Sequence, residues 1–394
     1  MNQRQAALNI LHKTIKDESY SNLLMRKELN KLPVIQRAFV TELVNGVLRK
    51  YEFLTYQFEN EIDGYTSLKN RLIICLALYE RFFMNQKDYV VNNEYVELAE
   101  SKFDKSFINA LLHKIVSLKN SDIAYIKYSI PRWIYNLLSS QYSEEDLIKI
   151  LNTYQKVPRV FYRINKSKAD ISMISDAIAI DDELFISKKN LIHSDEYEKG
   201  YFYVQDFNSA SLYKHLDLTD NCSLLDICSA PGSKLFNCLD IVDEKRCYAN
   251  DVHTHRVELI KKAASRLGFE NINYINYDGR ELNSKLNIEF DRILLDAPCS
   301  GLGVIGRKPD LKFHIKPENL DELQTLQYDL LNSAKHLLKK DGIMLYSTCT
   351  LNKKENNKMM IRFVSENKDL YILKEDTIIN GLGDCFYYCK LKRV

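Results

Sequence analysis

A series of short apolar runs in the C-terminal half of the chain constrains its fold more than any other feature of the sequence. Each run ends in a polar residue and is followed by a turn or by a segment of helical length. The runs occupy 224–225, 247–249, 272–275, 293–295 and 343–346. Because strands that alternate with helices form a doubly wound, mostly parallel sheet, we predict an α/β fold from about residue 205 onward. Sheets of this kind bind ligands at the C-terminal ends of their strands, so the polar residues there are candidate site residues.

The N-terminal part of the chain has a different pattern, in which apolar residues recur at helical spacing. Three such stripes lie in 7–15, 39–48 and 107–115, and no useful length alternates with period two. This pattern predicts helices throughout. The predicted domains are an all-helical domain at 1–122, a connector with a small α+β subdomain at 123–204, and the α/β domain at 205–394.

Charge and cysteine content exclude several classes of protein. The chain has 55 Lys and Arg against 53 Asp and Glu, so any nucleic acid must be bound by a local basic patch rather than by global charge. No apolar stretch approaches the length of a membrane-spanning helix, and no signal peptide is evident. Nine cysteines without regular spacing favour reduced thiols, and we therefore expect a cytoplasmic protein with no membrane association.

The first candidate site is the turn at 226–234, which follows a strand and opens a helix. Its small residues allow backbone N–H groups to approach a ligand closely. It is not a phosphate-binding P-loop, because Leu235 follows Lys234 where that motif needs Ser or Thr. Taken alone, the turn favours cofactor binding no more than a simple strand-to-helix connection.

Two aspartates at later strand ends extend this candidate site. Asp251 ends the next strand, where an acidic residue accepts hydrogen bonds from ribose hydroxyls, although an N-cap of the following helix is the alternative. Asp278 follows a third strand, where it is suited either to an adenine edge or to a simple turn.

Two cysteines lie at the ends of neighbouring predicted strands. Cys299 is in a loop with two glycines after Asp296, and Cys349 follows the last apolar run. A buried structural role is the alternative for each, but the pair suggests paired thiol chemistry. Cys385 and Cys389 are the closest cysteine pair, and since no second pair lies nearby, we predict no metal site.

Three of these segments together resemble a known family. The segments 226–234, 296–301 and 347–350 are similar to the motifs of RNA cytosine-5 methyltransferases that use S-adenosylmethionine (SAM). The helical N-terminus resembles a NusB-like RNA-binding domain, most closely at 37–49 and again at 107–112. The combination is similar to the bacterial 16S ribosomal RNA methyltransferases of the RsmB (Sun/Fmu) family, and the resemblance covers essentially the whole chain.

The resemblance implies a fold, a reaction and a set of site residues. The fold is a Rossmann-like SAM-dependent methyltransferase domain with an all-helical NusB-like N-terminal domain. In the family, the cysteine that corresponds to Cys349 is the nucleophile and the one that corresponds to Cys299 assists product release, while Asp296 could hydrogen-bond the cytosine. The implied SAM-binding residues are Cys228, Ser229, Ala230, Pro231, Gly232, Ser233, Lys234, Asp251, Asp278 and Asp296.

The implied substrate is 16S rRNA, free or in early assembly, methylated at a cytosine of the position 967 type by a monomeric enzyme. The basic residues suited to RNA contact are Arg37, Arg49, Lys50, Arg159, Arg163 and Lys166. The chain departs from the family pattern where Ser233 replaces a second glycine, which the turn tolerates only if the φ of Ser233 is negative.

Other functions remain open from sequence alone. The enzyme could act on another RNA such as tRNA, on DNA, or on a small molecule, or the chain could be a non-catalytic RNA-binding factor. Retention of both cysteines with the cofactor turn argues against the non-catalytic alternative. The presence of Cys349, and the absence of an obvious DNA target-recognition insert, favour RNA over DNA.

Overall fold

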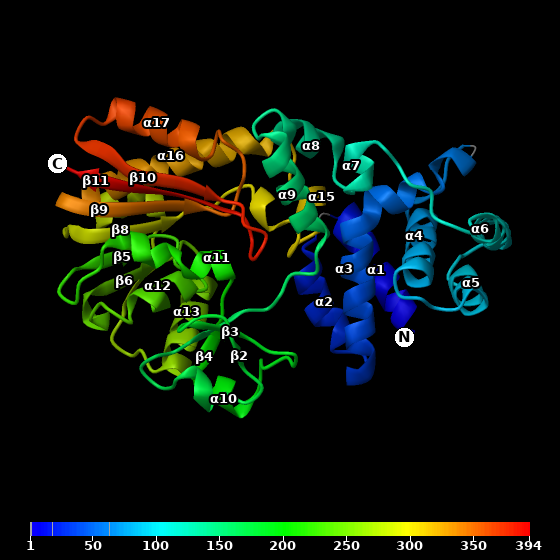
Figure 1. Ribbon diagram of the computed structural model, residues 1–394, viewed down its shortest axis with the longest axis horizontal. Helices are drawn as coiled ribbons and strands as arrows, with labels where there is room; N and C mark the ends of the chain where they lie inside the picture. Colours follow the sequence, from blue (N-terminus) through cyan, green and yellow to red (C-terminus); the bar gives the residue numbers. More distant parts are fainter. Residues whose placement is uncertain (1, 18, 63) are drawn as a thin grey trace. The chain divides into compact units, whose positions relative to one another are not determined.

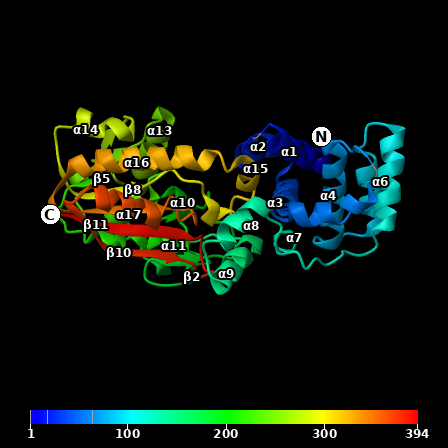
Figure 2. The same ribbon diagram turned by 90° about the horizontal axis from the view of Figure 1, so that it is seen from above.

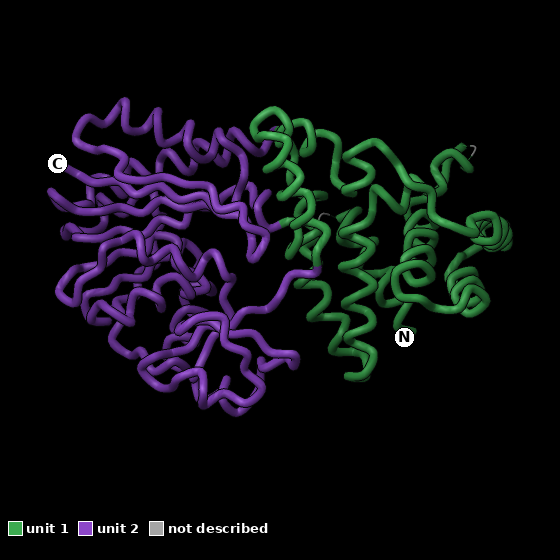
Figure 3. The backbone as a smooth tube through the Cα atoms, in the orientation of Figure 1, with its two compact units in different colours: residues 1–156, 305–317 green, residues 157–304, 318–394 purple. Residues whose placement is uncertain are grey.

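A computed structural model describes residues 2–17, 19–62 and 64–394. The chain divides into two compact units, which Figure 3 shows in different colours. Unit 1 contains 1–156 together with 305–317, and unit 2 contains 157–304 together with 318–394. The predicted domain boundaries at 122 and 204 differ from this division and stay predictions.

Unit 1 is built from helices. Its described helices are α1 (Gln3–Lys16), α2 (Ser21–Leu29), α3 (Val34–Tyr56), η1 (Glu59–Glu61), α4 (Leu68–Phe82), α5 (Asp88–Val96), α6 (Lys102–Lys114), α7 (Ala124–Lys127), α8 (Arg132–Ser139), α9 (Glu144–Gln155) and α15 (Leu311–His314). Helix α4 lies at the centre, because every residue from Leu72 to Tyr79 is buried in a core that α1 and α3 share. The prediction of an all-helical N-terminal region is confirmed.

The segment 305–317 packs within unit 1 although its neighbours on both sides in sequence belong to unit 2. The ammonium of Lys312 is buried and donates to Ser129 O at 2.7 Å and to Glu52 Oε2 at 2.5 Å. Ser21 N donates to Asp310 Oδ2 at 2.9 Å. Because a buried ammonium needs such partners, these contacts hold the segment against the helices of unit 1.

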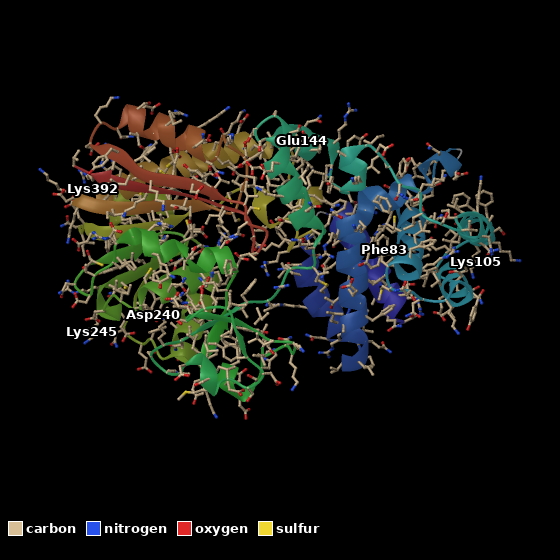
Figure 4. All side chains as sticks on the ribbon, viewed as in Figure 1. Phe83, Lys105, Glu144, Asp240, Lys245 and Lys392 are labelled. Atoms are coloured by element: carbon tan, nitrogen blue, oxygen red, sulfur yellow. The ribbon has the colours of Figure 1, made fainter. Side chains whose placement is uncertain are left out.

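Unit 2 begins with a small antiparallel sheet in the order β2-β3-β1-β4. The strands are β1 (Tyr162–Ile164), β2 (Ile178–Ala179), β3 (Leu184–Ile186) and β4 (Phe202–Val204), and the helices nearby in sequence are η2 (Ile171–Met173) and α10 (Asp195–Glu198). Arg163 on β1 is wholly buried and pairs with Glu183 and Asp240, each at 2.7 Å. Asp240 is labelled in Figure 4.

The larger sheet has seven strands in the order β10-β11-β9-β8-β5-β6-β7. They are β5 (Leu224–Asp226), β6 (Cys247–Asn250), β7 (Asn273–Ile275), β8 (Phe290–Asp296), β9 (Leu338–Thr348), β10 (Leu370–Ile378) and β11 (Phe386–Arg393). The five strands from β9 to β7 are parallel, whereas β11 runs antiparallel to β9 and β10 antiparallel to β11. The predicted doubly wound, mostly parallel sheet is therefore confirmed, with an antiparallel edge.

Helices cover both faces of this sheet (Figures 1 and 2). The helices of this part of unit 2 are α11 (Phe207–Ala210), η3 (Leu212–Leu216), α12 (Ser233–Cys238), η4 (Glu244–Arg246), α13 (Thr254–Leu267), η5 (Gly279–Glu281), α14 (Leu282–Lys285), η6 (Leu302–Val304), α16 (Asn319–Leu337) and α17 (Asn357–Glu366). Two separate cores result, one beneath α16 and α17 and the other beneath α12 and α13. Strands buried on both faces read as continuous apolar runs, as 293–295 does.

A membrane-spanning helix is not found among the described residues, since none of their helices is both long and apolar enough.

Candidate active site

The two candidate thiols meet at the C-terminal edge of the larger sheet. Strands β8 and β9 are parallel neighbours in which Asp296 is opposite Ser347, so the loops that follow them leave the sheet side by side. Their cysteines converge, and Cys299 Sγ lies 3.4 Å from Cys349 Sγ. Both side chains are partly exposed. The pair is therefore accessible and close enough for one sulfur to act on the other.

The close approach of the two sulfurs affects the ionisation of Cys299. The hydrogen bond to Cys349 raises the pKa of Cys299 well above its ordinary value, and burial raises it further. Two thiolates at this separation would repel each other, so only one thiol of the pair ionises readily. The raised pKa favours the neutral, protonated form of Cys299.

A buried carboxylate, Glu355, holds the two cysteine loops together. It accepts hydrogen bonds from the backbone N–H and the hydroxyl of Ser300, at 2.9 and 2.6 Å. The amides of Gln327 and Asn352 also donate to it, at 3.0 and 3.1 Å. Ser300 follows Cys299 directly and Asn352 follows Cys349 by three residues. We name these four residues the Glu355 cluster, and its hydrogen bonds link the loop of Cys299 to the loop of Cys349.

The backbone contacts of Gly303 show why the Cys299 loop needs a glycine at this position. Its N–H donates to Cys349 O at 2.9 Å, and its own carbonyl accepts from Cys385 N at 3.0 Å. A Cβ atom at this position would lie 2.2 Å from Cys385 O and 2.8 Å from Cys349 O. The three segments approach so closely that no side chain fits.

Lys234 and Asp296 form an ion pair beside the thiols. Lys234 Nζ lies 2.6 Å from Asp296 Oδ2, and Ser347 Oγ donates to Asp296 Oδ1 at 2.8 Å. Burial on its own lowers the pKa of Lys234, but the charges of Asp296 and Cys349 raise the pKa above its usual value. Lys234 was assigned to the cofactor turn; the structure also brings its charge to the side of the sheet that carries Cys349.

The cofactor turn has the backbone that its sequence requires. Gly232 has a φ of +100° and precedes α12, while Ser233 is the first residue of that helix. Because Ser233 is not among the residues with positive φ, replacement of the second glycine leaves the turn unstrained. The peptide bond between Ala230 and Pro231 is cis.

The ends of β5, β6 and β7 lie next to this turn. Asp251 is buried, accepts from His253 N at 3.1 Å and lies 3.3 Å from Arg256 Nη1. Asp278 instead caps η5, and its carboxylate binds Arg280 at 2.5 Å. Asn250 was not singled out, but its amide joins all three strand ends through Ile227 O and Tyr277 O, at 3.0 and 3.1 Å. A buried amide just before the acidic residue is the signal that would have identified it.

Asp226 gives the site a pH-dependent contribution to stability. Burial raises its pKa to about 7 from the ordinary value of 3.8. Between these values the folded chain keeps a proton that the unfolded chain has released, so the free energy of unfolding falls as pH rises from about 4 to about 7. The loss is about 4 kcal/mol at most and is complete above pH 7. We expect Asp226→Asn to lack this slope in denaturant unfolding measured across that range. The exposed Asp220→Asn serves as control, and parallel curves for the wild type and Asp226→Asn would contradict the assignment.

The predicted RNA-contact residues are corrected in part. Arg163 is fully buried between two carboxylates, and Arg49 is also buried, so neither presents its charge to an RNA. Periodicity missed this because the partners lie far away in sequence. Within the described ranges, no group of three or more His, Cys, Asp or Glu side chains is arranged to hold a metal ion.

Comparisons with known proteins agree with this geometry. A family described as 16S rRNA methyltransferase RsmB/F matches residues 213–382, and the NusB family matches residues 1–117. The "Probable ribosomal RNA small subunit methyltransferase B" of Bacillus subtilis is 31% identical and aligns with 93% of this chain and 89% of its own length. The "Ribosomal RNA small subunit methyltransferase B" of Yersinia enterocolitica is 26% identical, with 90% of each chain covered.

Among solved structures, that of PH0851 covers 100% of this chain and 99% of its own, with a TM-score of 0.80 at 20% identity. The NSun6 protein of Pyrococcus horikoshii covers 67% of this chain and 98% of its own, with a TM-score of 0.60 at 18% identity. These two likenesses concern the fold.

Proposed function

The chain belongs to the RsmB/F family of SAM-dependent rRNA methyltransferases, and from this premise we propose that it methylates C5 of a cytosine in 16S rRNA through a covalent bond to Cys349. The observation that carries the proposal is the pair of sulfurs 3.4 Å apart at the ends of two neighbouring strands. Methylation at a nitrogen or a ribose oxygen, which are nucleophiles already, would not need such a pair.

The residues at the other strand ends fit SAM. Asp226 Oδ1 is a buried carboxylate oxygen with no hydrogen-bond partner in the described chain, and buried Asp251 Oδ2 makes no hydrogen bond there beyond its ion pair with Arg256 at 3.3 Å. SAM offers an ammonium group and ribose hydroxyls as donors to such atoms. We propose that these carboxylates and the turn at 228–234 hold it, with Asp278 and Asp296 alongside. When bound, SAM supplies an electrophilic methyl group on a positively charged sulfur.

The chain's own groups prepare the cytosine for this methyl group. The thiolate of Cys349 adds to C6 after its proton has left to solvent, and the C5=C6 electron pair becomes available at C5. We propose that the Lys234–Asp296 pair holds the N3 and N4 edge of the ring, since the charge of Lys234 lies close enough to Cys349 to interact with it. Once C5 carries the methyl group, its proton leaves to water. As the C5–H electron pair forms the C5=C6 bond again, the S–C6 bond breaks and its electron pair returns to Cys349, whose sulfur receives the hydrogen bond of Cys299.

The first experiment is transfer of labelled methyl from SAM to protein-free 16S rRNA, followed by nucleoside analysis. Labelled 5-methylcytosine supports the proposal. A different labelled nucleoside would overturn the C5 assignment. Transfer to tRNA but not to 16S rRNA would show that tRNA, rather than 16S rRNA, is the substrate.

A second prediction concerns the ion pair at the base edge. Lys234→Met leaves the carboxylate of Asp296 without its cation and withdraws positive charge from Cys349, so we expect kcat to fall by about 100-fold or more. Asp296→Asn keeps a partner for Ser347 but loses the ion pair, and a similar loss is expected. Single-turnover rates with SAM at saturation measure both. If either variant changes only the KM for SAM, the residue serves the cofactor alone.

A further inference from the structure

A groove on the surface of unit 2 lies between the N-terminal halves of α16 and α17 and has a volume of about 620 Å³. One wall, from α17 and the turn before it, carries Lys354, Lys358 and Arg362. The other wall, from α16, presents two aspartates with polar side chains between them. Its residues are Asp321, Gln324, Thr325, Tyr328 and Asp329. Figure 2 shows both helices beside the sheet.

The α17 wall carries three cations, and two of them have no ion-pair partner in the described chain. Lys358 and Arg362 are four residues apart on one face of α17, and Lys354 in the turn before the helix lines the same wall. The guanidinium of Arg362 is held by Glu366 Oε1 at 3.0 Å and lies 4.4 Å from the ring of Tyr328. Lys354 and Lys358 are exposed, and no ion-pair partner for either is found within the described chain. The positive end of the α17 dipole lies beside them.

Both walls belong to the elements that position the thiols. Gln327, on the buried side of α16, donates to Pro298 O at 2.9 Å and to Glu355. Asn356, at the start of α17, donates to Thr350 O at 3.0 Å and accepts from Thr348 at 2.6 Å. The groove therefore opens over the same two helices whose inner sides hold the loops of Cys299 and Cys349.

We propose that this groove binds the single-stranded RNA next to the target cytosine, with phosphates along the α17 wall and ribose hydroxyls along the α16 wall. Phosphates take lysine ammonium groups, whereas a carboxylate repels phosphate but accepts a hydrogen bond from a 2′-hydroxyl. A target base that enters the thiol site has to leave its stack, which is cheapest in a single strand. The inference rests on the proposed function because it takes the RNA substrate as its ligand.

The test measures binding rather than methyl transfer. A single-stranded 16S rRNA fragment is titrated into the wild type, into Lys354→Ala/Lys358→Ala, and into a control with Lys245→Ala/Lys340→Ala. Both control lysines are exposed. Lys245 lies in η4, directly before β6, and Lys340 lies near the start of β9, so both are at the N-terminal ends of the parallel strands; Lys245 is labelled in Figure 4. We expect the groove variant to have a higher Kd for RNA and a salt dependence lower by about 0.7 in log–log slope for each lysine. The control should match the wild type, and the Kd for SAM should be unchanged in all three.

A second test concerns the α16 wall, which carries the aspartates. Asp329→Ala, which removes the acceptor, should weaken binding of RNA and leave binding of DNA of the same sequence unchanged, because only RNA has the 2′-hydroxyl. Equal strengthening of both would show phosphates on the α16 wall and overturn the assignment of the walls. If the lysine variant has the RNA affinity and the salt slope of the wild type, the proposal that this groove binds RNA is overturned. If the lysine variant loses RNA binding while the wild type forms no 5-methylcytosine, the proposed reaction fails and the groove stands.

Discussion

Cys349→Ala is expected to abolish methyl transfer, with a loss of at least about 1,000-fold, while SAM still binds. Without the sulfur no bond forms at C6, and C5 of cytosine by itself is too weak a nucleophile. Cys299→Ala should behave differently. It keeps the nucleophile but removes the S–H group 3.4 Å from it, so the S–C6 bond forms and its rupture slows. We expect a covalent RNA–protein adduct to accumulate in this variant.

Gel electrophoresis under denaturing conditions, with labelled RNA, measures the adduct. The double variant Cys299→Ala/Cys349→Ala is the control and should form none. Cys389→Ala, at a buried cysteine away from the strand ends, should leave the wild-type pattern. An adduct in the double variant would contradict the assignment of Cys349. An adduct in the single variant Cys349→Ala would show that Cys299 is the nucleophile instead.

Glu355→Gln is expected to lower kcat by about 100-fold, because a shift of about 1 Å in reacting groups has an effect of this size. The new amide group presents donors to the donors of Ser300, Gln327 and Asn352, which already surround the position. Each buried donor left without an acceptor costs about 1–3 kcal/mol, so the free energy of unfolding should fall as well. Single-turnover rates and denaturant unfolding measure the two effects.

A positioning role separates from a purely structural role when the adduct is measured. In a Cys299→Ala background, Glu355→Gln should reduce the rate of adduct formation even at temperatures where the variant is fully folded. Glu322→Gln, an exposed carboxylate on α16, is the matched control and should change neither quantity. A folded Glu355→Gln variant with a wild-type rate of adduct formation would show that the Glu355 cluster stabilises the loops without setting the thiol separation.

Much of the site was predicted from local patterns. The apolar runs marked the parallel strands, and in a parallel sheet their C-terminal ends share one edge, so Cys299, Cys349 and Asp296 were assigned to the same edge. The resemblance to a family, carried by three short segments, then gave these residues their expected roles. The backbone of Gly232 and Ser233 also follows from residue type, since only glycine adopts a φ of +100° readily.

The sequence by itself therefore determined the helical N-terminal region, the parallel strands, and the edge of the sheet at which Cys299 and Cys349 lie. Only the tertiary structure decided the 3.4 Å between the sulfurs, the contacts of Glu355, the burial of Arg163, and the place of 305–317 within unit 1. The reason is physical. Periodicity and turn chemistry act between residues close in sequence, whereas these four features depend on contacts between residues that are distant in sequence, and such contacts leave no local pattern.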